Sequence, residues 1–310
     1  MTSDKKTILV TGGAGFIGSN TVNLLCDQGH AVRVIDDLSF GYEEFLDPRA
    51  TFFKGSLANN DVLDKALSGV DVVMHFAASS IIKFSIDNPL TYIENNIVNS
   101  TKLLEGMRRN NVKKIVFSSS ASVYGEPLEI PITESHQKKP LQPYGASKMA
   151  FEDILSGYHH SFGIESVSLR FFNVYGPRDE QQPATRAVPL WIKAILRNEP
   201  VGVYWNGDQL RDYIFVRDVA QAHSDVMNLP GCNAFNIGSG SGIIMRDLLE
   251  EIVKLTGSTS EIKDLGERLG DPAKLVADTS AIHKAVGWKP KVSLTEGLQE
   301  AIAFYKSRMK

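Results

Sequence analysis

Residues 8–20, ILVTGGAGFIGSN, join a predicted strand to a predicted helix through three glycines. Gly12, Gly15 and Gly18 allow a tight turn and a close approach of the backbone, so a pyrophosphate can rest on the N-terminus of the helix. A glycine pattern by itself is weak evidence. Here it follows a strand and opens a helix, and this context predicts a dinucleotide-binding turn.

An acidic residue ends the next predicted strand. Asp36 lies in residues 31–37, AVRVIDD, directly after the first strand and helix. A carboxylate at this position can accept both ribose hydroxyls, and it repels a 2′-phosphate. We therefore expect NAD rather than NADP.

The first half of the chain alternates short apolar runs with helical patterns. Strands that are apolar on both faces and joined by amphipathic helices predict a parallel sheet that is covered on each side. Right-handed crossovers make this an α/β fold of the doubly wound, or Rossmann, type. The predicted strands lie in residues 6–12, 31–37, 70–78, 113–121 and 165–173, and the predicted helices in residues 18–30, 60–69, 88–111 and from Tyr144 onward.

Beyond Asn173 the pattern changes. A loop rich in proline and charge, residues 174–186, precedes a predicted helix at 187–199, and a closing helix is predicted at 294–308. Residues 233–240, NAFNIGSG, are typical of a strand that returns to the first sheet. We therefore predict a Rossmann domain over residues 1–172, with a return segment near 213–240, and a smaller interleaved α/β domain over 173–310.

Composition and charge exclude several classes of protein. The chain has 310 residues, 43% of them hydrophobic, and a formal net charge of −3, so no basic field predicts nucleic-acid binding. We see no signal peptide and no apolar run near the roughly 20 residues of a membrane span. Cys26 and Cys232 have no metal-ligand spacing, and the adjacent His159 and His160 have no evident third ligand. We expect a cytoplasmic protein with free thiols and without a metal.

The candidate chemistry lies in residues 142–155, QPYGASKMAFEDIL. Tyr144 and Lys148 are one helical turn apart on the same face, and the nearby ammonium favours the phenolate form of the tyrosine. Such a tyrosine can act as an acid or base near neutral pH. Ser120 ends a predicted strand, where it can relay or stabilise the proton, although Ser118, Ser119 and Ser122 compete for this role.

These motifs resemble the extended short-chain dehydrogenase/reductase superfamily. The glycines are spaced G-x-x-G-x-x-G, and HFAAS at 75–79, SSSASVYGE at 118–126 and YGASK at 144–148 follow in the family's order. One departure is Gly55-Ser56 in place of the usual Gly-Asp, where the serine hydroxyl could bond adenine and Leu57 could pack on its ring. The resemblance implies NAD contacts at Gly12, Gly15, Phe16, Ile17, Gly18, Asp36, Asp37, Leu38, Ser39, Ser56, Leu57, Phe76, Ala77, Ala78, Asn95, Ser118, Tyr144, Lys148 and Phe171.

The neighbours of Ser120 favour one reaction within this superfamily. Dehydratases and decarboxylases of sugar nucleotides carry acidic residues beside the equivalent serine or threonine, whereas Ala121 and Ser122 are neutral. Oxidising one carbon and reducing it again requires no second acid. The resemblance therefore points to a 4-epimerase, with Tyr144, Lys148 and Ser120 as its catalytic residues.

Three later segments resemble those of UDP-glucose 4-epimerases. They are LRFFNVYGPR at 169–178, VYWNGDQLRDYIFVRDVA at 203–220 and GERLGDPAKLVAD at 266–278. The resemblance implies that a UDP-sugar is bound by Ser120, Asn173, Arg186, Val188, Tyr204, Arg211, Arg268, Asp271 and Leu275. Two arginines on one diphosphate suit the bidentate geometry of the guanidinium group. Leu275 matches a residue that gates N-acetylated sugars, and its intermediate size neither requires nor excludes them. We rank UDP-glucose/galactose first, the N-acetylhexosamines second and UDP-glucuronate third.

Several alternatives stay open. UDP-glucuronate would use Arg178 or Arg186, but Asp179 and Glu180 oppose a carboxylate. A dehydratase or decarboxylase would require Glu126 to reach the sugar. An NAD-sensing regulatory protein on the same fold would typically have lost the tyrosine or the lysine. The family resemblance also implies a homodimer, formed through a four-helix bundle by the predicted helices at 88–111 and from Tyr144.

Overall fold

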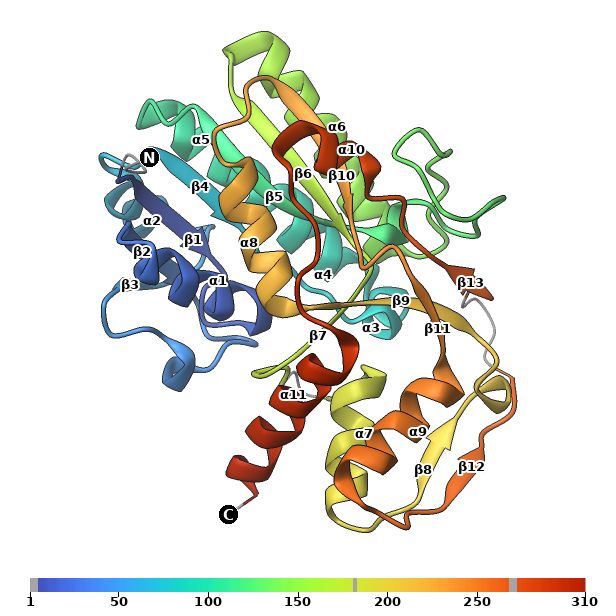
Figure 1. Cartoon of the computed structure of the whole chain (residues 1–310). Coiled ribbons are helices and arrows are strands. Elements are labelled where there is room, and N and C mark those ends of the chain that lie inside the picture. Colours follow the sequence, from blue (N-terminus) through green and yellow to red (C-terminus); the bar gives the residue numbers. More distant parts are fainter. Residues whose placement is uncertain (1–4, 181–182, 268–271, 310) are drawn as a thin grey trace. The chain divides into compact units, whose positions relative to one another are not determined.

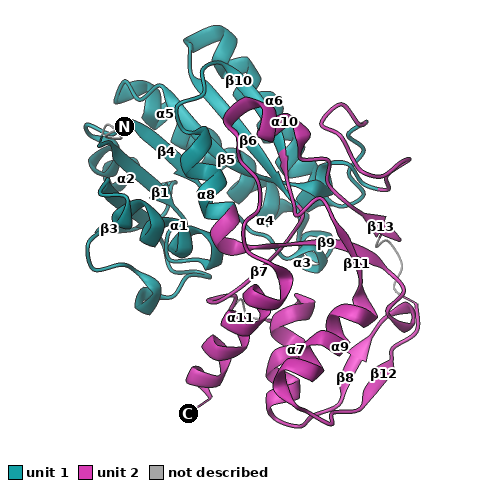
Figure 2. Cartoon of the chain, in the orientation of Figure 1, with its two compact units in different colours: residues 1–125, 137–171, 219–235 teal, residues 126–136, 172–218, 236–310 magenta. Residues whose placement is uncertain are grey.

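The computed structural model describes residues 5–180, 183–267 and 272–309. These residues form two compact units, coloured separately in Figure 2. Unit 1 takes its residues from 1–125, 137–171 and 219–235, and unit 2 from 126–136, 172–218 and 236–310. Compared with the predicted domains, the short segment 126–136 lies in unit 2, and the returning segment of unit 1 is residues 219–235.

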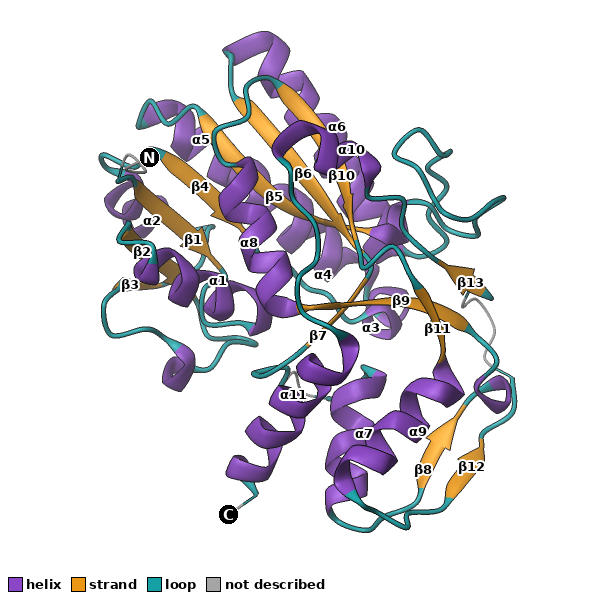
Figure 3. Cartoon of the chain, viewed as in Figure 1, coloured by secondary structure: helices purple, strands orange, loops and turns teal. Residues whose placement is uncertain are grey.

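A parallel sheet forms the centre of unit 1 (Figures 1 and 3). Among the described residues it has seven strands in the order β10-β6-β5-β4-β1-β2-β3, and each neighbouring pair from β3 to β6 is parallel. The order reverses between β1 and β4, which is the switch point where doubly wound folds bind ligands. The strands are β1 Thr7–Thr11, β2 Ala31–Asp36, β3 Thr51–Lys54, β4 Val72–His75, β5 Lys114–Ser120, β6 Glu165–Phe171 and β10 Cys232–Ile237.

Helices cover both faces of this sheet, as the sequence pattern predicted. Adjacent residues of β5 show the two faces, because the Ser118 side chain meets His223 of α8 whereas the Ser119 side chain meets Glu152 of α6. On the α6 face, α2, α5 and α6 pack in turn around buried residues such as Leu63, Met107 and Phe151. The helices are α1 Phe16–Asp27, α2 Asn60–Leu67, α3 Ile82–Asp87, α4 Pro89–Ile93, α5 Ser100–Arg109, α6 Pro143–Phe162 and α8 Val216–Val226, with short turns η1 Glu43–Phe45 and η3 Ala121–Val123.

The long helix predicted at 88–111 is not regular. It starts with Pro at the first helical position of α4 and ends as α5, but its middle, η2 Glu94–Asn99, is a π-helix. A π-turn places one extra residue in the helix, and such turns often lie at functional sites. The uniform apolar spacing of this segment did not indicate the irregularity, and the sequence pattern also did not indicate β3.

Unit 2 has small sheets and helices of its own. In one sheet β9 pairs with β11 in the antiparallel sense and with β13 and β7 in the parallel sense, and in another β8 pairs with β12. A capping box between Ser293 and Glu296 begins the closing helix, which packs with α7 and α9 around Trp191 and Tyr305. The elements are β7 Asn173–Tyr175, α7 Ala187–Leu196, β8 Val201–Val203, η4 Trp205–Gly207, β9 Leu210–Phe215, β11 Gly242–Ile244, α9 Met245–Thr256, β12 Ile262–Asp264, β13 Lys274–Leu275, α10 Ser280–Val286 and α11 Leu294–Arg308.

The described residues include neither a membrane-spanning helix nor a cluster of metal ligands. No helix in this part of the chain combines the length and the apolar character needed to cross a membrane. The same residues contain no group of three or more His, Cys, Asp or Glu side chains placed to hold a metal ion.

Candidate active site

The glycine turn connects β1 to α1 at the switch point of the sheet. Gly12 has a φ of +70°, and its N–H donates to the carbonyl of Ile35 at 2.9 Å. The helix begins at Phe16, its N-cap is Gly15, and its first turn carries no acidic residue. The N-terminus of a 12-residue helix therefore has neither a capping side chain nor a carboxylate of its own, as an anion-binding helix requires.

A glycine is required at these three positions for different physical reasons. A Cβ at Gly12 would lie 2.6 Å from the backbone nitrogen of Ala77, and a Cβ at Gly18 would lie 2.2 Å from the carbonyl oxygen of Gly12. Packing within the protein thus requires these two glycines. At Gly15 the nearest atom would be the Gly12 oxygen at 3.3 Å, so packing alone restricts this position less. A glycine there leaves the helix N-terminus uncovered, which fits the pyrophosphate of a dinucleotide.

Asp36 is fixed beside this turn. Its Oδ2 accepts a hydrogen bond from the N–H of Ala14 at 3.0 Å, and its Oδ1 accepts one from the N–H of Leu38 at 2.9 Å. Burial raises the pKa of Asp36, and these two backbone donors oppose that shift. Asp37 in turn accepts from the N–H of Ser39 at 2.9 Å. The carboxylate predicted to bind ribose is therefore held in one orientation at the end of β2.

Ser56 and Leu57 both have partners inside the protein. The Ser56 hydroxyl accepts from the N–H of Ala58 at 3.2 Å, and the Leu57 side chain is buried in the core of unit 1. Ser56 is half-buried, so its side chain can still line a ligand. The predicted adenine contact at this point stays a prediction.

The segments after β4 and at the end of β6 meet at His223. The rings of Phe76 and Phe171 lie 4.5 Å and 5.4 Å from its imidazole, centroid to centroid. Ala77, which the glycine turn touches, donates its N–H to Thr11 Oγ1 at 3.3 Å. The structure thus places these predicted cofactor residues, with the half-buried Ala78, around the carboxyl ends of β1, β4 and β6.

Asn96 is a buried polar residue that the sequence analysis missed. Asn95 of the π-helix is half-buried and donates to Ser79 Oγ at 3.1 Å. Asn96 accepts from the Ser79 N–H at 2.8 Å and donates to the Ser79 carbonyl and to Ser147 Oγ, both at 3.0 Å. It therefore ties the loop after β4 to α6. The doubled Asn-Asn inside an apolar helical pattern was the available signal.

Tyr144 and Lys148 lie on the first turns of α6. Pro143 at the first helical position favours this helix start, and Gly163, at a φ of 66°, ends the helix. Lys148 is 4% exposed, and its Nζ donates to the carbonyl of Ser118 at 2.8 Å. The same nitrogen is 5.9 Å from the centroid of the Tyr144 ring. The predicted pair is therefore brought together, with the ammonium buried and the half-buried phenol beside it.

Burial weakens the ammonium form of this lysine. Loss of hydration lowers the pKa of Lys148 to about 7, and the carboxylate of Glu152 opposes that shift. His75 is buried at the end of β4, where burial and the charge of Lys148 lower its pKa to about 3. His75 is thus a neutral ring, hydrogen-bonded to Thr11 and Ser100.

The four serines at the end of β5 have separate partners. Ser118 Oγ lies 3.2 Å from His223 Nε2, and Ser119 Oγ donates to Glu152 Oε1 at 2.6 Å, so both are used inside the protein. Ser120 Oγ donates to Ser122 Oγ at 3.0 Å and accepts from the Ser122 N–H at 3.2 Å. Ser120 and Ser122 are half-buried, which makes them the two serines a substrate can reach.

The predicted sugar-nucleotide residues that the structure describes lie in unit 2, apart from Ser120. Asn173 begins β7 opposite Tyr213, and Leu275 on β13 is in register with Arg211. Arg211 donates to the carbonyls of Leu210 and Ala273, and Arg186 Nη1 donates to Asp179 Oδ1 at 2.6 Å. Tyr204 is exposed, whereas Val188 is buried. Arg268 and Asp271 lie outside the described residues.

Together the fold and these residues define an enzyme that uses a dinucleotide. Residues 8–238 match the model of the NAD dependent epimerase/dehydratase family, and the chain belongs to this family. It is an NAD-dependent epimerase, as its motifs predicted.

The chain resembles three relatives over nearly the whole length of both sequences. A UDP-glucose 4-epimerase of Halalkalibacterium halodurans is 36% identical over 94% of this chain and 93% of its own. The solved UDP-N-acetylglucosamine 4-epimerase of Methanobrevibacter ruminantium, in complex with UDP-N-acetylmuramic acid, is 38% identical with a TM-score of 0.94, covering 99% of this chain and 100% of that one. The UDP-glucose 4-epimerase of Thermotoga maritima, solved with UDP-glucose, is 34% identical with a TM-score of 0.94, covering 98% and 100%.

Proposed function

We propose that this enzyme inverts C4 of a UDP-hexose through a transient 4-keto sugar. UDP-glucose and UDP-galactose are the first substrates to consider, and UDP-GlcNAc and UDP-GalNAc the second. The observation that supports the proposal is a single acid/base pair, Tyr144 beside buried Lys148, next to neutral residues after Ser120.

Each proposed catalytic residue has one task. Tyr144 removes the proton of the C4 hydroxyl and later returns it. Lys148 stabilises the phenolate by its charge, and Ser120 hydrogen-bonds the same substrate oxygen. The chemistry that NAD would supply when bound is the reversible acceptance of a hydride from C4.

The residues proposed to hold the cofactor fit its parts. The N-terminus of α1 after Gly15 takes the pyrophosphate, and Asp36 accepts from the adenosine ribose. Lys148 would donate to the nicotinamide ribose, because an ammonium has three donors and the Ser118 carbonyl uses one.

The residues beside Ser120 argue against dehydration or decarboxylation. Ala121 is buried and has no titratable group, and the hydroxyl of Ser122 bonds Ser120. Glu126, the next acidic residue along the chain, is exposed. Because elimination or loss of carbon dioxide requires a further proton transfer, this end of β5 suits oxidation and reduction at a single carbon.

For the nucleotide, we propose the residues that the resemblance implies in unit 2. Exposed Tyr204 offers a flat face for uracil, and Arg211 a guanidinium for phosphate. Arg186 is a weaker candidate because it already pairs with Asp179. Asn173, Val188 and Leu275 complete the described set, and Arg268 and Asp271 are proposed from the sequence alone.

The substrate test is a product analysis. The protein is incubated with NAD and, separately, with UDP-galactose, UDP-GalNAc and UDP-glucuronate, and the nucleotide sugars are separated by chromatography. We expect the C4 epimer of UDP-galactose, of UDP-GalNAc, or of both. A 4-keto-6-deoxy sugar or carbon dioxide from UDP-glucuronate would instead select a dehydratase or decarboxylase.

Tyr144→Phe tests the acid/base role. We expect kcat to fall by roughly 10²–10⁴-fold, because the phenol is the proton acceptor, while bound NAD measured by absorbance is retained. Tyr158→Phe is the matched control on the same helix, since its hydroxyl donates to Glu105 instead. Equal losses in both variants would contradict the role of Tyr144.

We also propose a homodimer formed through the region of α4, η2 and α6. Leu103, Leu104 and Met107 of α5 are buried in the core of unit 1, so they are not available to a second copy. Apolar side chains that stay exposed include Leu90 at 71% and Ile93 at 45%. Sedimentation of the wild type and of Leu90→Glu/Ile93→Glu tests the proposal, with a dimer expected for the first and a monomer for the second.

A further inference from the structure

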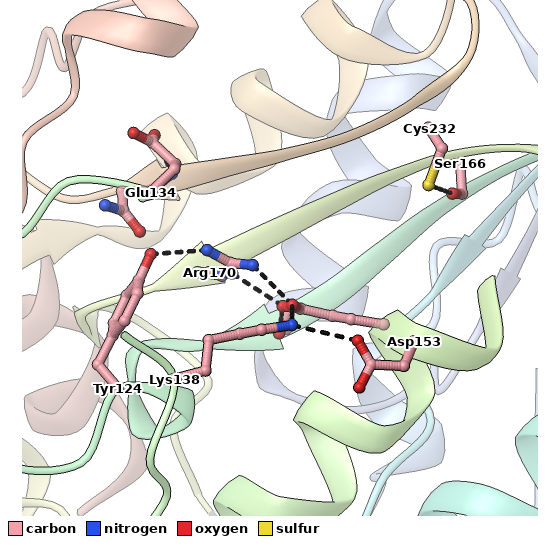
Figure 4. A network of polar contacts seen from close by, with 10 residues as sticks. Tyr124, Glu134, Lys138, Asp153, Ser166, Arg170 and Cys232 are labelled. Carbon is pink, nitrogen blue, oxygen red and sulfur yellow. Dashed lines mark hydrogen bonds and ion pairs between the residues drawn. The ribbon is translucent and has the colours of Figure 1, made fainter. Parts of the chain in front are cut away.

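A buried ion pair connects α6 to β6, two helical turns beyond Tyr144. Arg170 donates from Nε to Glu152 Oε1 at 2.9 Å and from Nη2 to Glu152 Oε2 at 2.7 Å. The two residues are 5% and 8% exposed. Figure 4 shows Arg170 also reaching the hydroxyl of Tyr124, at 2.8 Å. The fork-shaped pairing fixes both groups in one geometry.

The same carboxylate holds the end of β5. Ser119 Oγ donates to Glu152 Oε1 at 2.6 Å, and the preceding residue, Ser118, accepts from Lys148 Nζ at 2.8 Å. Two successive residues of β5 are therefore tied to two successive turns of α6. The next residue of the strand is Ser120, so these ties set the position of Tyr144 and Lys148 relative to that serine.

The charged and titratable groups around Lys148 come from several elements. On its own helix Tyr144 precedes it and Glu152 follows it by one turn each. His75 of β4 and His223 of α8 are buried on the neighbouring elements, and burial lowers their pKa values to about 3 and about 4, so both are neutral. Arg170 of β6 is bonded to Glu152. Glu152 thus supplies the negative charge that offsets the burial of the lysine.

We propose that Glu152 is a positioning residue of the epimerase, which fixes α6 to the end of β5 and keeps buried Lys148 in its ammonium form. Arg170 holds this carboxylate in place through two hydrogen bonds. This inference rests on the proposed roles of Tyr144 and Lys148 and extends them to a buried pair outside the residues proposed to bind substrate or cofactor.

Titration of Lys148 itself is the decisive measurement. The 310-residue chain, saturated with NAD, is labelled with ¹³C at the lysine side chains, and the Lys148 signal is assigned by its loss in Lys148→Arg. In Glu152→Gln we expect a titration midpoint about one pH unit below that of the wild type, because an opposite charge at short range shifts a pKa by roughly that much. The basic limb of the kcat profile should move in the same direction.

Asp153→Asn is the matched control. Asp153 is the next residue of α6, it also pairs with Lys138, and its side chain is 67% exposed. Removing this exposed carboxylate should leave the Lys148 midpoint unchanged. An equal shift in both variants, or no shift in Glu152→Gln, would overturn the proposal.

Two further variants separate charge from structure. Arg170→Met removes the competing positive charge and should raise the Lys148 midpoint above that of the wild type. Glu152→Gln/Arg170→Met should fall between the wild type and Glu152→Gln, and it provides the measurement if Glu152→Gln does not fold. Any other order contradicts the proposal. If the order holds but the wild type epimerises no UDP-sugar, the charge role stands and the proposed function fails.

Discussion

Two buried carboxylates, one in each unit, face an arginine in different ways. In unit 1 Glu152 accepts two hydrogen bonds from Arg170 and one from Ser119, and Lys138 lies 3.4 Å away. In unit 2 Asp179 is 3% exposed and accepts one bond, from Arg186 to Oδ1. Within the described residues its buried Oδ2 has no hydrogen-bond partner.

This difference decides the direction of the pKa shift. Burial raises the pKa of both groups, but the bonds and charge of Arg170, with Ser119 and Lys138, outweigh burial and leave the pKa of Glu152 below its ordinary value. For Asp179 burial outweighs Arg186, and the pKa is raised. For these two carboxylates, the number of donors rather than the presence of an arginine accounts for the opposite directions of the pKa shift.

Removing the arginine of each pair should give the largest difference in the free energy of unfolding between the two pairs. Arg170→Met leaves an ionised, buried Glu152, and we expect the free energy of unfolding at neutral pH to fall by about 3–5 kcal/mol. Arg186→Met should lower it by only about 1 kcal/mol, because Asp179 can take up a proton and the Arg186 side chain is 35% exposed. Urea unfolding followed by circular dichroism measures both, and equal losses would contradict the comparison.

Neutral replacement of each carboxylate should give effects of opposite sign. Glu152→Gln removes the charge that four donors stabilise, and we expect a loss of about 2 kcal/mol at pH 8. Asp179→Asn removes a charge whose burial is poorly compensated, and we expect a gain of about 1 kcal/mol under the same conditions. The same unfolding assay measures the sign. A loss in Asp179→Asn would show that its ion pair with Arg186 outweighs its burial.

The sequence predicted the elements that local patterns determine. Glycine spacing, the acidic end of β2 and the Tyr144–Lys148 spacing follow from backbone geometry within a few residues, so they could be found without coordinates. The alternation of apolar strands with amphipathic helices likewise predicted the doubly wound sheet. UDP-sugar residues could be proposed only by resemblance, because scattered arginines have no local pattern that marks a phosphate site.

What the sequence analysis missed depends on contacts between distant residues. Glu152 and Arg170 are separated by a helix and a turn, and each alone is typical of a surface position. The available signal was that both interrupt buried runs: Glu152 follows Phe151 on α6, and Arg170 lies between Leu169 and Phe171 on β6. The π-helix at Glu94–Asn99 is similar, since buried Asn96 bonds Ser79 and Ser147.

The pH dependence of stability should distinguish the pairs further. The pKa of Glu152 is below its ordinary value of 4.5, so its stabilisation is complete above that pH and is lost as the pH falls through the folded value. The pKa of Asp179 is above 3.8, so its ionisation destabilises the fold as the pH rises from there. We expect the advantage of the wild type over Glu152→Gln to shrink below about pH 4.5, and that of Asp179→Asn over the wild type to grow as the pH rises above about 4. Parallel curves would contradict both assignments.

Removing the more exposed cation beside Glu152 should have the smallest effect. Lys138 lies 3.4 Å from Glu152 and 3.3 Å from Asp153, and its side chain is 28% exposed. We expect Lys138→Met to lower the free energy of unfolding by about 0.5 kcal/mol, since a partly exposed ion pair contributes little.

Lys254→Met is the control. Lys254 pairs with Glu251, and its side chain is 77% exposed, so its loss should lower the free energy of unfolding by less than the loss of Lys138 does. A loss in Lys138→Met as large as that in Arg170→Met would mean that net positive charge, rather than the fork of bonds from Arg170, stabilises ionised Glu152. The number of nearby cations would then decide whether each carboxylate is charged. Asp179 has the positive charges of both Arg186 and Lys193 nearby, so we would expect it to be charged as well.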